Sequence, residues 1–340
     1  MTDNKVEEKN TLLATPFVAM TEILKSCNYI DSQSLRKTCH GIRELVDLVK
    51  PDPQLKSVLY AVNRGAIIVT LGFLDGKSKG IYYFDDRRGG CLISTREREA
   101  AVPGHRIIAN TTMASVVLQD FNTLKESLLS QPPLEQVMLV MGEDALPVFH
   151  ACIAPSLADQ PSLYTESLQM VLGDCRHATS VLPLVSADVL DTLMIMSIGE
   201  RRDDVVLDLA ELAVSEHWRS VQTLVLHGPL IDDPMPAVSI PNSFIQMVTI
   251  RPEQVSRLKE ELRISTTLQL CLIQLQNDEN RVQVLRAIVP EGIDNDVAEG
   301  TWNFRTPQPG KLLRVAYFPN HLSFSFAIPE KLEADAVVLD

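Results

Sequence analysis

The sequence lacks long apolar runs and lacks an excess of positive charge. None of its apolar stretches approaches the roughly 18 residues that a membrane-spanning helix needs. The first ten residues, MTDNKVEEKN, are polar and charged, and no apolar stretch follows that could serve as a signal peptide. We therefore expect a soluble protein of the cytoplasm or nucleus, with no membrane partner. The formal net charge of −13 repels phosphate backbones, so no nucleic-acid partner is expected either.

The sequence also lacks the short motifs that mark common catalytic and metal sites. Its six cysteines include no CxxC pair, and GxGxxG, GxSxG and HExxH are absent. We interpret the cysteines as small core residues in a reducing compartment. We accordingly predict no catalytic residue, no cofactor and no metal ion, and we expect that the chain is not an enzyme.

Four local features invite a functional interpretation, and for each we favour a structural one. The segment GFLDGKS at 72–78 has three residues between its glycines where a phosphate-binding loop has four, so we predict a hairpin turn. Cys175 and His177 form a pair without further metal ligands. The aspartates between 203 and 208 suit the start of a helix. Trp218 is expected in the core, with a partner for its ring nitrogen.

An amphipathic helical segment is present near the N-terminus. Apolar residues from Leu35 to Val49 recur at i, i+4, i+7, i+11 and i+14, which predicts one helical stripe. Asp31 or Ser32 can cap its start. The Lys-Pro step at 50–51 ends it, because the residue before a proline is pushed out of the helical region.

Residues 14–50 carry more apolar side chains than two or three short helices can bury among themselves. Thr15 and Pro16 are expected to begin the first of these helices. A segment of about forty residues is too small for an independent core. The surplus side chains must therefore pack on the rest of the chain or on helices of a partner protein.

The region after the helices changes to a strand-like pattern. Four β-rich runs between 55 and 98, separated by glycine-containing turns, predict a small antiparallel meander. Helical spacing returns over 111–130. The last segment, 281–329, is β-rich again, and we expect it to end in a hairpin at Asn320-His321 that caps the preceding region.

Between these regions, strand-like and helical runs alternate from residue 133 onward. Helical runs are expected at 177–186, 205–218 and 252–265. Apolar positions in the strand-like runs recur every 23 to 31 residues, at Leu168, Leu193, Leu224, Met247 and Leu270. This period is typical of leucine-rich repeats and predicts a curved β/α array with parallel strands and a continuous core.

The N-terminal helical segment resembles an F-box, in which a proline opens the first helix and an Ile-Leu pair follows. Thr38 stands where the motif usually has valine, and Ile42 where it usually has tryptophan. The matching positions are, in order, Pro16, Ile23-Leu24, Ile30-Asp31, Leu35, Thr38-Cys39, Ile42 and Leu45-Val46. Outside this segment, KPDPQL at 50–55, GCLIS at 90–94 and SEHWRSVQTLVLHGPLID at 215–232 resemble the nematode F-box A family, whose members carry a C-terminal FTH domain.

The resemblance implies a substrate-receptor subunit of an SCF-type ubiquitin ligase. The F-box would bind the Skp adaptor and, through it, a cullin, while the C-terminal region would bind a target protein that the sequence does not identify. The residues expected to contact the adaptor are Pro16, Ile23, Leu24, Leu35, Leu45 and Val46.

Pattern and resemblance together predict a mixed α+β and α/β fold. It comprises an N-terminal F-box of short helices, a small antiparallel β meander, and a leucine-rich-repeat-like β/α array with a C-terminal β hairpin. The expected boundaries are a flexible N-terminus (1–10), the F-box (11–52), a β meander plus helix (55–130), an FTH-like β/α repeat region (131–280), a β-rich cap (281–330) and an acidic tail (331–340).

Two alternatives remain open at this point. The chain can be a non-catalytic interaction scaffold whose F-box-like helices dock internally, in which case residues 16–49 are protected in the isolated protein. It can also be an enzyme built on the β/α array. That alternative requires a cavity where several titratable groups with perturbed pKa values converge.

Overall fold

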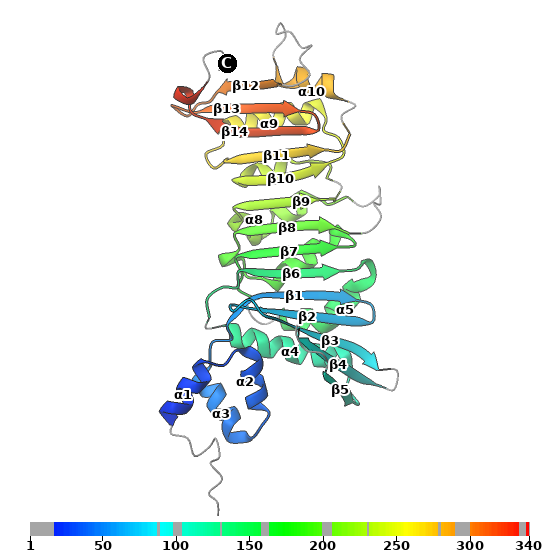
Figure 1. The fold of residues 1–340 in the computed structure, drawn as a ribbon. Helices are drawn as coiled ribbons and strands as arrows, with labels where there is room; N and C mark the ends of the chain where they lie inside the picture. The colour runs from blue at the N-terminus through cyan, green and yellow to red at the C-terminus, as the bar shows by residue number, and fades with distance from the viewer. Residues whose placement is uncertain are drawn as a thin grey trace, which may run out of the picture.

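A computed structural model describes residues 17–86, 89–97, 104–129, 131–157, 163–198, 206–229, 231–277, 280–289, 300–332 and 338–339. In this part of the chain, 15 strands form one mixed sheet that runs the length of the molecule (Figure 1). The strand order is β15-β12-β13-β14-β11-β10-β9-β8-β7-β6-β1-β2-β3-β4-β5. The longest described helix has 16 residues, and no described helix has both the length and the hydropathy that a membrane crossing requires.

The region after the N-terminal helices folds as the predicted antiparallel meander. Its strands are β1 (Leu55–Asn63), β2 (Ala66–Phe73), β3 (Ser78–Asp86), β4 (Gly90–Glu97) and β5 (Gly104–Ala109), each antiparallel to the next. The GFLDGKS segment forms the turn from β2 to β3, with Gly76 at φ +81°, so the hairpin prediction is confirmed. Helix α4 (Met113–Leu128) follows, as expected, and contacts β3 and β4.

Strand β1 also pairs in parallel with β6, so the meander continues directly into the next region. The strands of that region are β6 (Gln136–Met141), β7 (Ser167–Leu172), β8 (Thr192–Ser197), β9 (Thr223–His227), β10 (Asn242–Met247) and β11 (Leu270–Leu275). All five neighbouring pairs from β6 to β11 are parallel, which confirms the predicted strand direction.

The expected equivalence of the repeating apolar positions is only partly right. Leu168, Leu193 and Leu224 do align across β7, β8 and β9. Leu224 then aligns with Ser243 in place of Met247, and Leu270 aligns with Asn242. The sequence period could not fix this register, because a strand shows apolar residues at several positions. Met247 lies four residues after Ser243 on the same buried face, whereas Leu270 lies one residue before Cys271 and so on the other face.

One face of the parallel strands is covered and the other is open. Burial alternates along β6 and β7, so every second side chain is fully buried. Figure 1 shows the helices behind the sheet, on the buried face. They are α5 (Leu146–Cys152), α6 (Ala178–Val181), α7 (Leu209–Ala213), α8 (Glu216–Ser220), α9 (Pro252–Ile264) and α10 (Arg281–Ile288). Short 3-10 turns lie between them: η2 (Glu143–Ala145), η3 (Ala154–Leu157), η4 (Cys175–His177), η5 (Leu182–Leu184), η6 (Ala187–Val189) and η7 (Met235–Ser239).

The C-terminal part extends the same sheet. Strands β13 (Leu312–Phe318) and β14 (His321–Ala327) form the predicted hairpin, with Asn320 at φ 63° in the turn, and β14 pairs antiparallel with β11. The edge of the parallel array is therefore covered. Strands β12 (Gly300–Arg305) and β15 (Val338–Leu339) follow, and η8 (Pro329–Lys331) lies before β15. The expected β-rich segment from 281 is confirmed only from Gly300 onward, since α10 comes first and packs on α9.

The N-terminal segment contains three helices, α1 (Phe17–Lys25), α2 (Tyr29–Arg36) and α3 (His40–Val49), below β1 and α4 in Figure 1. The prediction of one helix through Leu35–Val49 was therefore wrong. The chain leaves the helix at 37–39, where the Thr38 hydroxyl donates to the Leu35 carbonyl at 2.8 Å. Asn28, and neither Asp31 nor Ser32, caps α2. The helix stop after Val49 is confirmed, with Lys50 in the left-handed region.

The cysteines only partly fit the core prediction. Cys91, Cys152, Cys175 and Cys271 are buried, but Cys27 is half-buried and Cys39, at the N-cap of α3, is exposed. Burial raises the pKa of Cys152 and of Cys271 to about 11. Both thiols therefore remain protonated at neutral pH, which makes them poor nucleophiles.

Thiol labelling tests this arrangement. We expect iodoacetamide at about pH 8 to modify Cys39 rapidly in the folded protein, because its side chain is exposed. The four buried thiols should react only at the rate of unfolding. Mass spectrometry after short labelling, with a urea-unfolded sample as the reference, measures both. Rapid modification of Cys271 in the folded protein would contradict the structure.

Candidate interaction surfaces

The three N-terminal helices have a small core of their own. Met20 and Leu24 of α1 and Ile42 and Val46 of α3 form a buried cluster that is separate from the main core of the sheet. Leu35, Leu45 and Val49 are partly buried and pack against it. An ion pair between α2 and α3, with 2.9 Å between Arg36 Nε and Asp47 Oδ1, adds a polar contact. We call α1, α2 and α3 the helical unit.

The six predicted adaptor contacts differ in their accessibility. Leu24 and Val46 are buried in the small core, while Leu35 and Leu45 are half-buried against it. Ile23 is 47% exposed. Pro16 lies outside the described residues. In the free chain, Ile23 is therefore the one member of the described five with a largely exposed side chain, and the role of all six in adaptor binding stays a prediction.

The helical unit also exposes apolar side chains that the sequence reading did not select. Phe17 and Val18 of α1 are 57% and 73% exposed, and Leu48 of α3 is 70% exposed. Which apolar residues face the small core depends on how the three short helices pack, and the sequence pattern does not record this. The exposed apolar side chains make the helical unit a candidate surface for association with another protein.

A second candidate surface is the open face of the parallel strands. Side chains on this face alternate with the buried ones, and none of them belongs to the main core. One ladder across neighbouring strands runs Met138, Gln169, Met194, Val225, Phe244 and Leu272, all half-buried. The ladder is a mostly apolar stripe with two methionines, and methionine side chains adapt to partners of different shape.

A third feature is a cleft of about 620 Å³ between the helical unit and the meander with α4. We call it the junction cleft. Tyr29 of α2, Tyr60 of β1 and Tyr83 of β3 line it. The Tyr83 hydroxyl donates to the Asp120 carboxylate of α4 at 2.7 Å, whereas the buried Tyr60 hydroxyl has no hydrogen-bond partner among the described residues. A buried polar group without a partner costs roughly 1–3 kcal/mol, so Tyr60 invites a functional explanation.

The electrostatics of the junction cleft do not favour proton transfer at neutral pH. Burial, followed by the neighbouring Asp120, raises the pKa of Tyr29 and of Tyr83 above the usual value for tyrosine. Burial, followed by Tyr29, likewise raises the pKa of Tyr60. All three hydroxyls therefore stay protonated near pH 7 and can act as hydrogen-bond donors.

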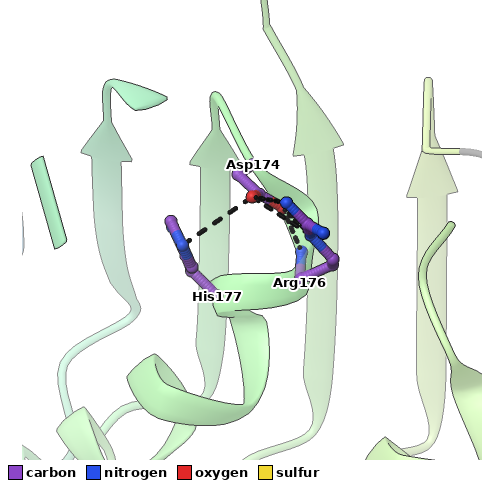
Figure 2. A network of polar contacts seen from close by, with 3 residues as sticks. All are labelled: Asp174, Arg176 and His177. Carbon is purple, nitrogen blue, oxygen red and sulfur yellow. Dashed lines mark hydrogen bonds and ion pairs between the residues drawn. The ribbon is translucent and has the colours of Figure 1, made fainter. Parts of the chain in front are cut away.

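The Cys175–His177 region does not form a metal site in the structure. Figure 2 shows Asp174, Arg176 and His177 grouped at the end of β7. The Arg176 guanidinium contacts both carboxylate oxygens of Asp174, at 2.7 Å for the closest pair, and this hydrogen bonding lowers the pKa of Asp174. An arginine thus satisfies the carboxylate that a cation would need. Within the described residues, no group of three or more His, Cys, Asp or Glu could hold a metal ion.

Two other local predictions are settled by hydrogen bonds. Trp218 is buried, and its ring nitrogen donates to the Pro236 carbonyl at 3.2 Å, as expected. Asp208 caps α7 by accepting from the Ala210 backbone at 2.8 Å, which confirms a helix start there. The other aspartates of that group, at 203 and 204, lie outside the described residues.

Two conservative substitutions in the junction cleft should change stability in opposite directions. Tyr83→Phe removes the donor to Asp120 and should lower the free energy of unfolding by about 1 kcal/mol. Tyr60→Phe removes a buried hydroxyl without a partner and should raise it by up to about 1 kcal/mol. Urea denaturation of the two variants beside the wild type measures both changes. A loss of stability in Tyr60→Phe equal to that in Tyr83→Phe would show that the Tyr60 hydroxyl is satisfied.

Comparisons with known proteins find no match for this chain. No protein-family model matches the sequence, no curated protein matches it, and no solved structure matches its fold. What the chain does is therefore inferred from its own residues and their geometry.

Proposed function

We propose that the chain is a substrate-receptor subunit of an SCF-type ubiquitin ligase. In this proposal the helical unit binds the Skp adaptor, which connects to a cullin, and the remainder of the chain binds a target protein. The receptor performs no bond chemistry. It raises the effective concentration of target lysines near a ubiquitin-charged enzyme held elsewhere in the complex.

The observation that carries the proposal is that only some of the apolar side chains in the helical unit are buried. Four of them close a small core, while Phe17, Val18, Ile23 and Leu48 remain largely exposed. Four exposed apolar side chains within 32 residues suit contact with a partner protein. Since α1 and α3 make their main contacts within the helical unit, their outer surfaces are available to helices of a partner.

The open face of the parallel strands supports the second half of the proposal. Its ladder of half-buried apolar side chains crosses six strands without a covering helix in Figure 1. A target protein that packed on this stripe would be held by the same rigid sheet that carries the helical unit. The chain could then hold adaptor and target at a fixed separation, as proximity catalysis requires.

The alternative is a protein-interaction scaffold whose helical unit is docked internally. One observation favours it: Tyr29 of α2 belongs to the main core, and its backbone N–H donates to the Pro53 carbonyl at 3.0 Å. Helix α2 is therefore attached to the sheet. The attachment is confined to one side of the unit, and it also suits a docking unit that must be held in a defined direction.

A charge placed on the exposed apolar surface tests the proposal. We expect Val18→Asp and Ile23→Asp to weaken binding of the Skp adaptor by at least about tenfold, because an aspartate at an apolar interface must be desolvated. Both side chains are largely exposed, so the fold should survive. Co-purification and calorimetry with the purified adaptor measure the change.

The matched control for this experiment is Val214→Asp. Val214 is 76% exposed, close to the 73% of Val18, but it is the C-cap of α7 and lies outside the helical unit. Its substitution should leave adaptor binding unchanged. Full adaptor binding by folded Val18→Asp and Ile23→Asp, or no binding by the folded wild type, would favour the scaffold alternative.

A further inference from the structure

The junction cleft is basic although the protein as a whole is strongly acidic. The formal net charge of the chain is −13. Among the described residues that line the cleft, only Asp120 is acidic, and its carboxylate already accepts from Tyr83. Its basic lining residues are Arg36, Lys37, Arg43, Lys79, His105 and Arg106. A concentration of positive charge at a concave site of an acidic protein selects negatively charged ligands.

The basic side chains come from both sides of the cleft. Lys37 and Arg43 belong to the helical unit, whereas Arg106 lies on β5 of the meander. All three are exposed, so their charges can meet a ligand at the mouth. Arg36 is already paired with Asp47, and we do not count it among the ligand-holding residues.

The interior of the cleft has a different chemistry. Its lining includes the half-buried Ile30 of α2, Ile81 of β3 and Ile93 of β4, with the buried tyrosines next to them. The Tyr60 ring packs edge-on against Phe121 at 5.8 Å between centroids. Both side chains are almost fully buried, so the apolar surface open to a ligand comes from the half-buried isoleucines. The cleft therefore offers an apolar wall beside its basic side chains.

We propose that the junction cleft binds a small amphipathic anion. The apolar or aromatic body of the ligand lies against the wall that contains Ile30, Ile81 and Ile93, and its carboxylate, sulfonate or phosphate group meets Lys37, Arg43 and Arg106. The volume of about 620 Å³ suits a single drug-sized molecule.

Binding at this place has a structural consequence. The ligand touches α2 on one wall and β2, β3 and α4 on the other. It therefore adds contacts between the helical unit and the sheet, beyond the attachment through Tyr29. This inference goes beyond the proposed ubiquitin-ligase role and does not depend on it, since the cleft can bind a ligand whether or not the helical unit binds an adaptor.

A pair of fluorescent probes tests the proposal directly. The anionic probe 8-anilinonaphthalene-1-sulfonate and the neutral N-phenyl-1-naphthylamine share the same apolar body and differ by the sulfonate. We expect the folded full chain to bind the anionic probe at a single class of site, at least about tenfold more tightly than the neutral one. Raising the salt concentration should weaken the anionic probe alone, because ions screen the charges at the mouth.

Variants connect the binding to the cleft. The double variant Arg43→Gln, Arg106→Gln should weaken the anionic probe by about tenfold and leave the neutral probe unchanged. The control Arg286→Gln removes an exposed charge from α10, distant from the cleft, and should change neither probe.

Two results would overturn the proposal. The first is equal affinity of the folded wild type for the two probes, or no binding of either. The second is anionic binding that Arg43→Gln, Arg106→Gln and Arg286→Gln reduce equally, which would show that the net charge and not the cleft is responsible. Circular dichroism of every variant excludes probe binding to unfolded chains. Adaptor binding is measured separately, so failure here leaves the ubiquitin-ligase proposal to its own test.

Discussion

The parallel pairing of β1 with β6 is the contact on which the arrangement of the molecule depends. It aligns Ser57–Val62 with Gln136–Met141 over six residues. Without it, the antiparallel meander and the parallel array would be two separate sheets joined by α4. With it, the described strands form one continuous sheet, and the helical unit, attached beside β1, has a fixed position relative to the array.

Much of the fold followed from periodicity, because period-2 burial and glycine-containing turns are local properties of the sequence. The meander, the parallel strands and the terminal hairpin were accessible in this way. The break at 37–39 was not, since the apolar stripe from Leu35 to Val49 continues in sequence across it. The register of β10 and β11 was missed because neighbouring strands are set by long-range pairing, which no local pattern records.

The candidate surfaces could likewise be predicted only in part from the sequence. The apolar surplus of the helical unit was visible in the sequence, but which residues are exposed depends on the packing of three helices. The junction cleft was not visible, because Tyr29, Tyr60, Tyr83 and Asp120 come from four elements and share no spacing. The one available signal was that four of the six tyrosines lie within residues 29–83, and only the fold shows that three of them line one cleft.

The helical unit has a much smaller hydrophobic core than the sheet. A core of four fully buried side chains is too small to hold the helical unit together independently, so its order depends on attachment through Tyr29 and on any partner that covers its surface. The stability of such a unit rises when a partner binds it, by an amount set by the affinity and concentration of that partner. In the proposed receptor role, the chain would combine a continuous sheet with a docking unit that a partner stabilises.

Amide hydrogen exchange of the full chain, alone and with the purified Skp adaptor, tests this account most directly. The account predicts that amides of α1 and α3 exchange much faster than those of β6–β11 in the free chain, and that the adaptor slows them while the sheet is unchanged. Equal protection of α1, α3 and β6–β11 in the free chain, with no change on adding the adaptor, would contradict it and show that the helical unit belongs to the protein's own core.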